Sequence, residues 1–243
     1  IYNINLRIDR MSKAPAVDYA LRIIELFSET QNEIGIADIC NSLGINKNAA
    51  SRVLESLLEY NWVYLSDSVQ KKYRFTLKPF SLVSKCTPQY ALAEIAKPDL
   101  QRLNGQLGDA VYLGIKNGNN VLYLLHLDSA KEVRINGRVG GEYPLTTSAP
   151  GKVLLAYGEH PKRFENGAAQ IKACGYATDN EEFAKGIICI ACPVYDDTGN
   201  VAAAVGISSL TIYDDINSLI NNKLPQLSEA ARNISLNLGW RGI

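Results

Sequence analysis

The sequence predicts an α+β protein with two domains. Three stretches of helical periodicity and a short hairpin occupy residues 12–76, whereas residues 88–243 alternate helices with pairs of strands joined by turns. A chain of 243 residues is long enough to bury a substantial core in one large domain or in two ordinary ones. Helices mixed with antiparallel hairpins favour a sensor-like α+β architecture for the second domain.

The first domain begins with three predicted helices. Residues 16–27 place apolar side chains at helical spacing, and Asp18 near the start suits the helix dipole. A second, short helix is predicted at Ile36–Leu43 and ends at Gly44, which tolerates the positive φ of a C′ position. Asn46 can then cap a third helix. The short connection between the last two helices fits a helix-turn-helix.

A basic hairpin is predicted after these helices. Residues 62–65 and 72–76 are β-prone and flank a polar turn. Residues 68–78 contain four Lys or Arg and no acid, although the whole chain balances 25 Lys and Arg against 25 Asp and Glu. Three helices followed by such a hairpin are the layout of a winged helix-turn-helix, with a positively charged wing.

The polar N-terminal face of the third helix carries the candidate DNA contacts. This part of a recognition helix meets base edges, and Asn and Arg can make bidentate contacts with adenine and guanine. A solvated face on a structural helix is the alternative, which the basic hairpin at the right place makes weaker. The candidate DNA-binding residues are Asn46, Lys47, Asn48, Ser51 and Arg52 on the helix and Lys71, Lys72 and Arg74 on the hairpin.

The remaining elements are predicted in order along the chain. Residues 77–85 form an amphipathic stretch before Pro88, so we expect a linker helix over 77–87. Helices are then predicted at 90–107, 151–157 and 212–238, and strands at 110–116, 121–127, 132–136, 187–195 and 201–208.

Composition excludes disordered and fibrous proteins. The chain is 47% hydrophobic and 21% charged, as expected of a soluble globular protein. No apolar run approaches the ~18–20 residues that cross a bilayer, and residues 1–13 lack the apolar core of a signal peptide. Five cysteines are too few, and odd in number, for a disulfide framework. We therefore expect a cytoplasmic protein with reduced thiols and no membrane partner.

Motifs for catalysis are weak. Residues 150–153 lack both the leading Gly and the following Ser or Thr of a phosphate loop. The turn at 148–151 precedes a helix and its N–H groups could receive a small anion, but an ordinary capped helix is the simpler interpretation. His126 and His160 lie in no triad-like pattern. We expect neither an enzyme nor a cofactor.

Cys189 and Cys192 have the two-residue spacing of redox or metal-binding pairs. They lie in an apolar strand, where positions three apart point to opposite faces. A zinc site would need about four nitrogen or sulfur ligands. We expect no metal site, and a thiol or metal redox sensor stays an alternative.

These segments together resemble the IclR family of bacterial transcriptional regulators. The resemblance runs from about Ala14 to Gly239, and its most specific parts lie in the second domain. The matching segments are 14–27 for the first helix, 43–54 for the helix-turn-helix, 73–75 for the wing, 148–156 for the signature loop and helix, and 175–182 with 186–194 for the motif that follows.

The resemblance implies a winged helix-turn-helix (12–76) joined by a linker helix (77–87) to a GAF-like effector-binding domain (88–243). It also implies a dimer or a dimer of dimers on palindromic operator DNA, and an effector that is often a carboxylate or sugar acid. By this resemblance, the turn at 148–151 becomes the favoured anion-receiving loop. The implied effector-binding residues are Ser148, Ala149, Pro150, Gly151, Asp179, Ile187, Cys189 and Ser208.

Two departures from the family pattern stand out. Residues 48–51 differ from the recognition helices of relatives, so an operator sequence cannot be transferred. The segment between Gly158 and Gly175 is shorter than usual, and we expect a peripheral helix to be missing there. The alternative from another class is a small-molecule enzyme whose N-terminal domain serves only for dimerisation.

Overall fold

The computed structural model describes residues 14–29, 33–79, 81–82 and 88–242. The chain divides into two compact units, residues 1–86 and 87–243. Most of the linker helix predicted over 77–87 lies outside the described residues. In the part of the chain that is described, no helix is both long enough and apolar enough to span a membrane.

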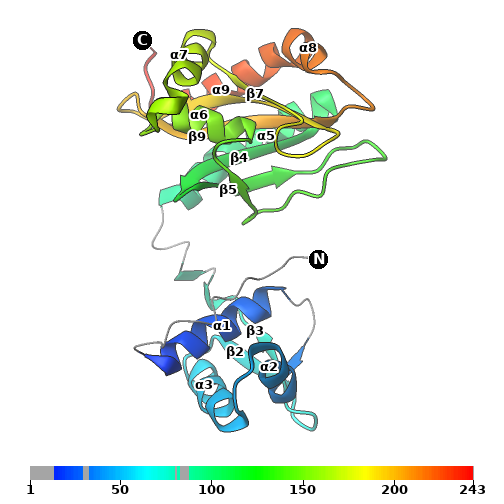
Figure 1. Ribbon diagram of the computed structural model, residues 1–243, viewed down its shortest axis with the longest axis vertical. Coiled ribbons are helices and arrows are strands. Elements are labelled where there is room, and N and C mark those ends of the chain that lie inside the picture. Colours follow the sequence, from blue (N-terminus) through cyan, green and yellow to red (C-terminus); the bar gives the residue numbers. More distant parts are fainter. Residues whose placement is uncertain (1–13, 30–32, 80, 83–87, 243) are drawn as a thin grey trace. The chain divides into compact units, whose positions relative to one another are not determined.

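The N-terminal unit is a winged helix-turn-helix (Figure 1). Three helices of its described part are combined with a three-stranded sheet in the order β1-β3-β2, in which β1 precedes α2 and the β2–β3 hairpin follows α3. Its elements are α1 (Pro15–Glu29), β1 (Ile34–Gly35), α2 (Ile36–Leu43), α3 (Lys47–Glu59), β2 (Val63–Asp67) and β3 (Lys72–Phe75). The predicted helices and hairpin of this unit are confirmed.

Local signals fix the ends of these helices. Gly44 adopts φ 66° after α2, a left-handed conformation that glycine reaches without strain. The Asn46 side chain accepts a hydrogen bond from the N–H of Ala49 at 2.9 Å and so caps α3. Ile39 and Leu54, from the two helices, are buried in one core. The turn between them therefore sets how α3 is presented.

The C-terminal unit is built on a six-stranded antiparallel sheet in the order β6-β5-β4-β9-β8-β7. The strands are β4 (Ala110–Asn117), β5 (Asn120–Leu127), β6 (Glu142–Pro144), β7 (Ala177–Asn180), β8 (Ile187–Tyr195) and β9 (Val201–Leu210). The helices are α5 (Pro88–Leu107), α6 (Ala149–Tyr157), η1 (Lys162–Phe164), α7 (Glu165–Cys174), α8 (Ile216–Ser218), η2 (Leu219–Lys223) and α9 (Leu224–Asn237).

Each face of this sheet packs on its own pair of helices. Alternate residues of β8 show the division: Ile188 and Cys192 lie in a core with α5 and α9, whereas Cys189 and Ala191 lie in a core with α6 and α7 (Figure 1). The α+β class is confirmed, and Cys189 and Cys192 point to opposite faces of the sheet as their spacing predicts.

Two predictions for this unit are wrong in detail. Residues 132–136 form no strand, because the N–H of Val133 donates to the Tyr213 hydroxyl instead of a neighbouring strand. The helix predicted at 212–238 is broken into α8, the π-helix η2 and α9, with Pro225 near the start of α9. The segment between Gly158 and Gly175, from which we expect a peripheral helix of the family to be missing, contains η1 and the ten-residue α7.

A buried ionic cluster joins distant parts of the C-terminal unit. Asp109 is fully buried and accepts hydrogen bonds from Lys131 at 2.6 Å and from Lys223 at 2.5 Å. Asp214 contacts the same two lysines, at 3.2 and 2.7 Å, and accepts a hydrogen bond from Ser209. Opposite charges therefore alternate where the start of β4, the segment after β5 and η2 meet.

The cluster predicts a loss of stability in acid. Burial by itself raises the pKa of Asp214, but hydrogen bonds from Lys223, Ser209 and Lys131 outweigh it and hold the pKa well below the ordinary value. The stabilisation is complete above the ordinary Asp pKa of about 3.9 and is lost as the pH falls through the lower folded-state pKa. We expect the midpoint temperature of thermal unfolding to decrease when the pH is lowered below about 4. This decrease should be smaller for Asp214→Asn than for the parent protein, and it should be the same as in the parent for Asp197→Asn, which changes an exposed residue. If the midpoint temperature depends on pH equally in the parent and both variants, Asp214 does not contribute to the loss of stability in acid.

Candidate functional site

The exposed end of α3 presents polar side chains to solvent. Lys47, Asn48 and Arg52 are exposed, whereas Ala50 and Val53 are buried against the rest of the N-terminal unit. The amide oxygen of Asn46 is occupied as the helix cap. The Ser51 hydroxyl donates to Glu55 Oε1 at 3.2 Å. Among the five helix candidates, Lys47, Asn48 and Arg52 are thus the freest to contact a partner.

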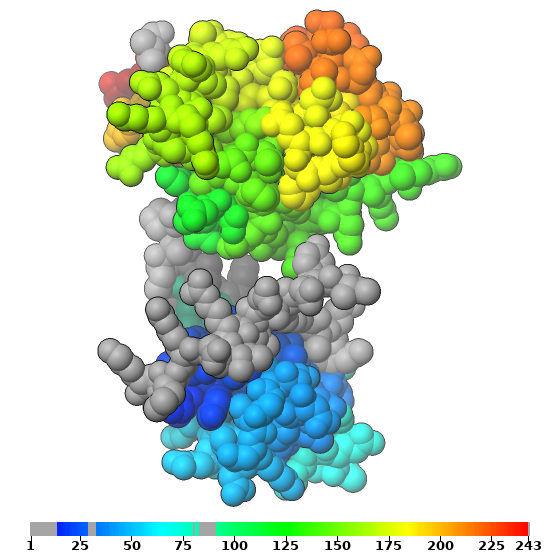
Figure 2. Space-filling model, in the orientation of Figure 1, coloured from blue at the N-terminus to red at the C-terminus, as the bar shows by residue number. Residues whose placement is uncertain are grey.

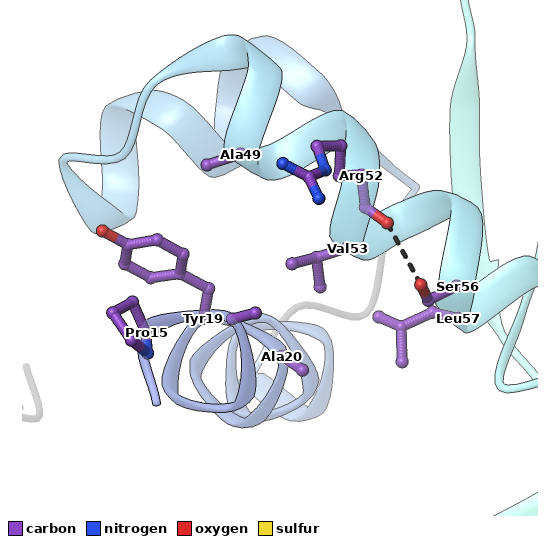
Figure 3. Close-up of a pocket in the computed structure, with 9 residues that line it drawn as sticks. Pro15, Tyr19, Ala20, Ala49, Arg52, Val53, Ser56 and Leu57 are labelled. Atoms are coloured by element: carbon purple, nitrogen blue, oxygen red, sulfur yellow. Dashed lines mark hydrogen bonds between the residues drawn. The ribbon is translucent and has the colours of Figure 1, made fainter. Parts of the chain in front are cut away.

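A groove separates α1 from α3. Tyr19 and Pro15 of α1 line one side, and Ala49, Arg52 and Val53 of α3 line the other (Figure 3). Arg52 therefore lies at the border between this groove and the exposed end of α3.

The basic charges of the wing are partly paired. Lys72 Nζ lies 2.9 Å from Asp38 Oδ2, and Arg74 Nε lies 3.1 Å from Glu33 Oε1. The hydrogen bond from Lys72 lowers the pKa of the Asp38 carboxyl. Lys71, at the exposed tip with φ 50°, has no ion pair within the described residues. Asp38 and Glu33 lie outside the counted window but beside the wing in the fold, so the net positive charge of the wing is smaller than the count along the sequence indicates.

The wing and the helix-turn-helix adjoin on the surface of the N-terminal unit. The Lys72–Asp38 pair links β3 to α2 directly. In the space-filling view, the light-blue atoms of the helix-turn-helix and the cyan atoms of the hairpin are both exposed at the lower end of this unit (Figure 2). The two groups of candidate DNA contacts can thus meet one partner together.

The C-terminal unit has a small pocket of about 30 Å³, which is lined by aromatic, aliphatic and small polar residues. Ile187, Cys189 and Ser208, three of the predicted effector-binding residues, line it. The Cys189 Sγ lies 3.0 Å from the Ser208 Oγ. Sequence reasoning missed the aromatic part of the lining, which consists of Tyr112, Tyr123, His126, Tyr143 and Phe183.

One signal in the sequence could have indicated Tyr112. Gly206 lies opposite Tyr112 in the β4–β9 register, and a Cβ at Gly206 would come within 2.5 Å of the Tyr112 ring. A glycine inside a strand often marks such a close approach. The ring of Tyr112 in turn stacks on Tyr123, with 4.6 Å between centroids.

The predicted loop at 148–151 is buried and caps α6. The Ser148 hydroxyl donates to the carbonyl of Pro144 and accepts the N–H of Gly151. A Cβ at Gly151 would come within 2.5 Å of the Leu145 backbone, so only glycine fits. The N–H groups of Gly151 and Lys152 are both bonded to Ser148, and Pro150 has none. Few donors of this turn are left for an anion.

Asp179 borders the pocket beside Cys189, which it faces in the β7–β8 register. Its Oδ1 accepts the N–H groups of Glu182 and Phe183 at 2.8 and 3.2 Å. Its Oδ2 is buried and has no hydrogen-bond partner within the described residues. Burial raises the pKa of the Asp179 carboxyl, against the opposing effect of those two N–H groups.

The thiols do not form a redox or metal site in this arrangement. Burial raises the pKa of Cys189 to about 12 and that of Cys192 to about 11, so both thiols are protonated near neutral pH. The two side chains belong to opposite faces of the sheet. In the described ranges, no group of three or more His, Cys, Asp or Glu could hold a metal ion. The redox-sensor alternative therefore gains no support.

Comparisons with known proteins agree with this architecture. Residues 16–66 match the family model of the IclR helix-turn-helix domain, and residues 85–166 and 159–236 match that of the bacterial transcriptional regulator IclR C-terminal domain. The HTH-type transcriptional regulator KdgR of Dickeya chrysanthemi is 29% identical over 233 residues, which cover 86% of this chain and 75% of the relative.

Two solved structures share the fold over nearly the whole chain. The Thermotoga maritima IclR has a TM-score of 0.76 and 23% identity, covering 93% of this chain and 99% of that one. An IclR homologue of Microbacterium hydrocarbonoxydans complexed with 4-hydroxybenzoate has a TM-score of 0.77 and 21% identity, covering 92% and 98%.

Proposed function

The chain belongs to the IclR family of bacterial transcriptional regulators, and from that premise we propose a separate function for each of its two units. The N-terminal unit binds operator DNA with α3 in the major groove and the wing against the backbone or the minor groove. The C-terminal unit binds a small organic effector that changes this DNA affinity. We assign residues 12–76 to the DNA-binding domain, 77–87 to a linker helix and 88–243 to the effector domain.

The exposed end of α3 is the observation that carries the DNA-binding proposal. Lys47, Asn48 and Arg52 project from the part of a recognition helix that reaches base edges, beside a hairpin whose tip carries Lys71. A two-fold dimer would place two such helices on half-sites roughly 34 Å apart, or a multiple of that distance. The family resemblance is what supports a dimer or dimer of dimers, a palindromic operator and a place in the bacterial cytoplasm.

The buried pocket of the C-terminal unit supports the effector proposal. Three of the predicted contact residues, Ile187, Cys189 and Ser208, come together there with Asp179 beside them. An IclR homologue of the same fold is complexed with 4-hydroxybenzoate, which supports a small organic molecule as the effector of this chain. A carboxylate or sugar acid stays the prediction of the family resemblance.

Selection from random duplexes and a ligand screen test the two halves of this proposal. We expect the full chain to enrich a palindromic site from a library of random DNA. We also expect one compound in a panel of small organic molecules to raise the stability of the protein, by about 2.7 kcal/mol at one hundred times its dissociation constant. Turnover of that compound without any sequence-selective DNA complex would favour the enzyme alternative instead.

A further inference from the structure

The pocket proposed for the effector is too small for an organic molecule. Its volume of about 30 Å³ holds on the order of one or two water molecules. Pockets that bind small organic ligands measure roughly 300–1,000 Å³. Part of the lining must therefore move aside before an effector can enter.

One segment of the lining belongs to no strand and no helix. Residues 131–139, which we call the strap, lie between β5 and β6, and most of their side chains are exposed. Ile135 and Gly137 of the strap line the pocket. Most of the other lining residues lie on paired strands of the sheet. The strap can therefore move away from the pocket without breaking the sheet.

The first residues of the strap are bonded to the buried ionic cluster and to the turn after β9. Lys131 Nζ donates to Asp109 Oδ1 at 2.6 Å and lies 3.2 Å from Asp214 Oδ2. The same Nζ lies 4.8 Å from the centre of the Tyr213 ring. The N–H of Val133 donates to the Tyr213 hydroxyl at 3.0 Å. Two neighbouring residues of the strap thus share one anchoring point.

The rest of the strap closes the pocket by contact. In the described part of the chain, residues 134–139 form no hydrogen bond with a helix or a strand. A Cβ at Gly137 would come within 2.2 Å of the His126 ring, whose side chain is only 6% exposed. The strap therefore lies directly on the lining at Gly137. Beyond it, the N–H of Gly140 donates to the carbonyl of Tyr123 at 2.8 Å.

The loop after β7, which also lines the pocket, is bonded more completely. Asp179 Oδ1 accepts the N–H groups of Glu182 and Phe183 at 2.8 and 3.2 Å. The N–H of Glu181 donates to the carbonyl of Ile187 at 3.0 Å. Moving this loop would break several backbone hydrogen bonds at once, whereas moving the strap breaks the contacts of Lys131 and one backbone bond. The strap is therefore the easier part of the lining to open.

We propose that the strap is a gate over the effector pocket, and that Lys131, through Asp109 and Asp214, is the latch that holds this gate closed. When Lys131 leaves, both carboxylates keep Lys223, which lies 2.5 and 2.7 Å from them. The ionic cluster therefore persists while the strap opens. This inference rests on the proposed function, because it concerns entry to the proposed effector site.

Alkylation of Cys189 measures how often the strap opens. Cys189 lines the pocket, whereas Cys192 is buried on the opposite face of the sheet. When closing is faster than the reaction, the labelling rate of a buried thiol follows the population of its open form. The full chain is incubated with iodoacetamide, and tandem mass spectrometry gives the rate at each thiol. We expect Lys131→Met to raise the rate at Cys189 by about tenfold or more, with the rate at Cys192 unchanged.

Tyr213→Phe tests the latch without changing any charge. It removes the hydroxyl that accepts the N–H of Val133 and keeps the ring beside Lys131. We expect the rate at Cys189 to rise by about threefold, as for one lost hydrogen bond. Lys162→Met removes an exposed lysine of η1 and is the matched control, which should leave both rates unchanged.

Two results would overturn the gate. One is an unchanged rate at Cys189 in both Lys131→Met and Tyr213→Phe. The other is an equal rise at Cys189 and Cys192, which would mean that the whole unit loosens. The labelling requires neither effector nor DNA, so its failure is distinguishable from failure of the proposed function. A chain with a gated Cys189 that selects no operator would contradict the regulatory proposal and leave the gate in place.

Discussion

Replacing Asp109 by alanine is expected to lower the unfolding free energy of the C-terminal unit by about 3–5 kcal/mol, because it leaves buried positive charge without its partner. Asp109 is fully buried between Lys131 and Lys223. Once it is removed, both lysines must share Asp214, which is already bonded to each of them. Urea unfolding followed by circular dichroism, with the C-terminal transition analysed by itself, measures the loss.

Asp128→Ala is the matched control for this variant. Asp128 is also a carboxylate in a close pair, with His126, but its side chain is 57% exposed. The His126 side chain is buried, but the Asp128 carboxylate stays in contact with water, so we expect its removal to cost only about 0–1 kcal/mol. A loss of 1 kcal/mol or less for Asp109→Ala would mean that water or rearrangement of the lysines replaces the missing charge, and that the cluster does not hold the start of β4 to η2.

The elements that the sequence predicts well are those encoded by neighbouring residues. The cap at Asn46 and the left-handed turn at Gly44 depend on side chains and backbone within a few positions of each other. The alternation along β8 likewise requires only the pleat of one strand. These signals were sufficient for the winged helix-turn-helix, for the α+β class and for the opposite orientations of the two strand cysteines.

The interactions that the sequence does not reveal are long-range. Asp109 and Lys223 are 114 positions apart, and Arg74 is 41 positions from Glu33. Counting charge in a window of the hairpin therefore overstated the free positive charge of the wing. The same limitation applies to residues 132–136, whose apolar alternation suggests a strand although the preceding Lys131 is bonded to Asp109 and Asp214.

Part of the candidate effector site could be predicted from sequence motifs, and part of it depends on long-range contacts. Family motifs indicated Ile187, Cys189 and Ser208, which line the pocket. Two other residues of these motifs have structural roles: Ser148 caps α6, and Gly151 allows the close approach of the Leu145 backbone. The aromatic part of the lining arises from strands and loops that meet only in the folded unit, so no local pattern could assemble it.

Replacing Arg52 or Lys71 by alanine is expected to weaken operator binding in two different ways. Arg52 lies on α3, where a bidentate contact with guanine contributes about 1–3 kcal/mol of discrimination. We expect Arg52→Ala to lose roughly that amount on the preferred operator and to accept any base at one position. Lys71 lies at the wing tip without an ion pair among the described residues. Its loss should weaken all sequences equally and reduce the slope of log K against log salt by about 0.9.

Lys72→Ala provides a comparison with Lys71→Ala on the same wing, because Lys72 is already paired with Asp38. A lysine that must leave a carboxylate to reach phosphate gains less from DNA, so this variant should change the salt slope less than Lys71→Ala does. Binding measured between 50 and 200 mM salt, on the selected operator and on each single-base variant of it, gives both quantities. If Lys71→Ala combined with Lys72→Ala leaves affinity and slope unchanged, the wing does not contact DNA. If Arg52→Ala weakens every sequence alike, Arg52 contacts phosphate and specificity must come from Lys47 or Asn48 at the exposed end of α3.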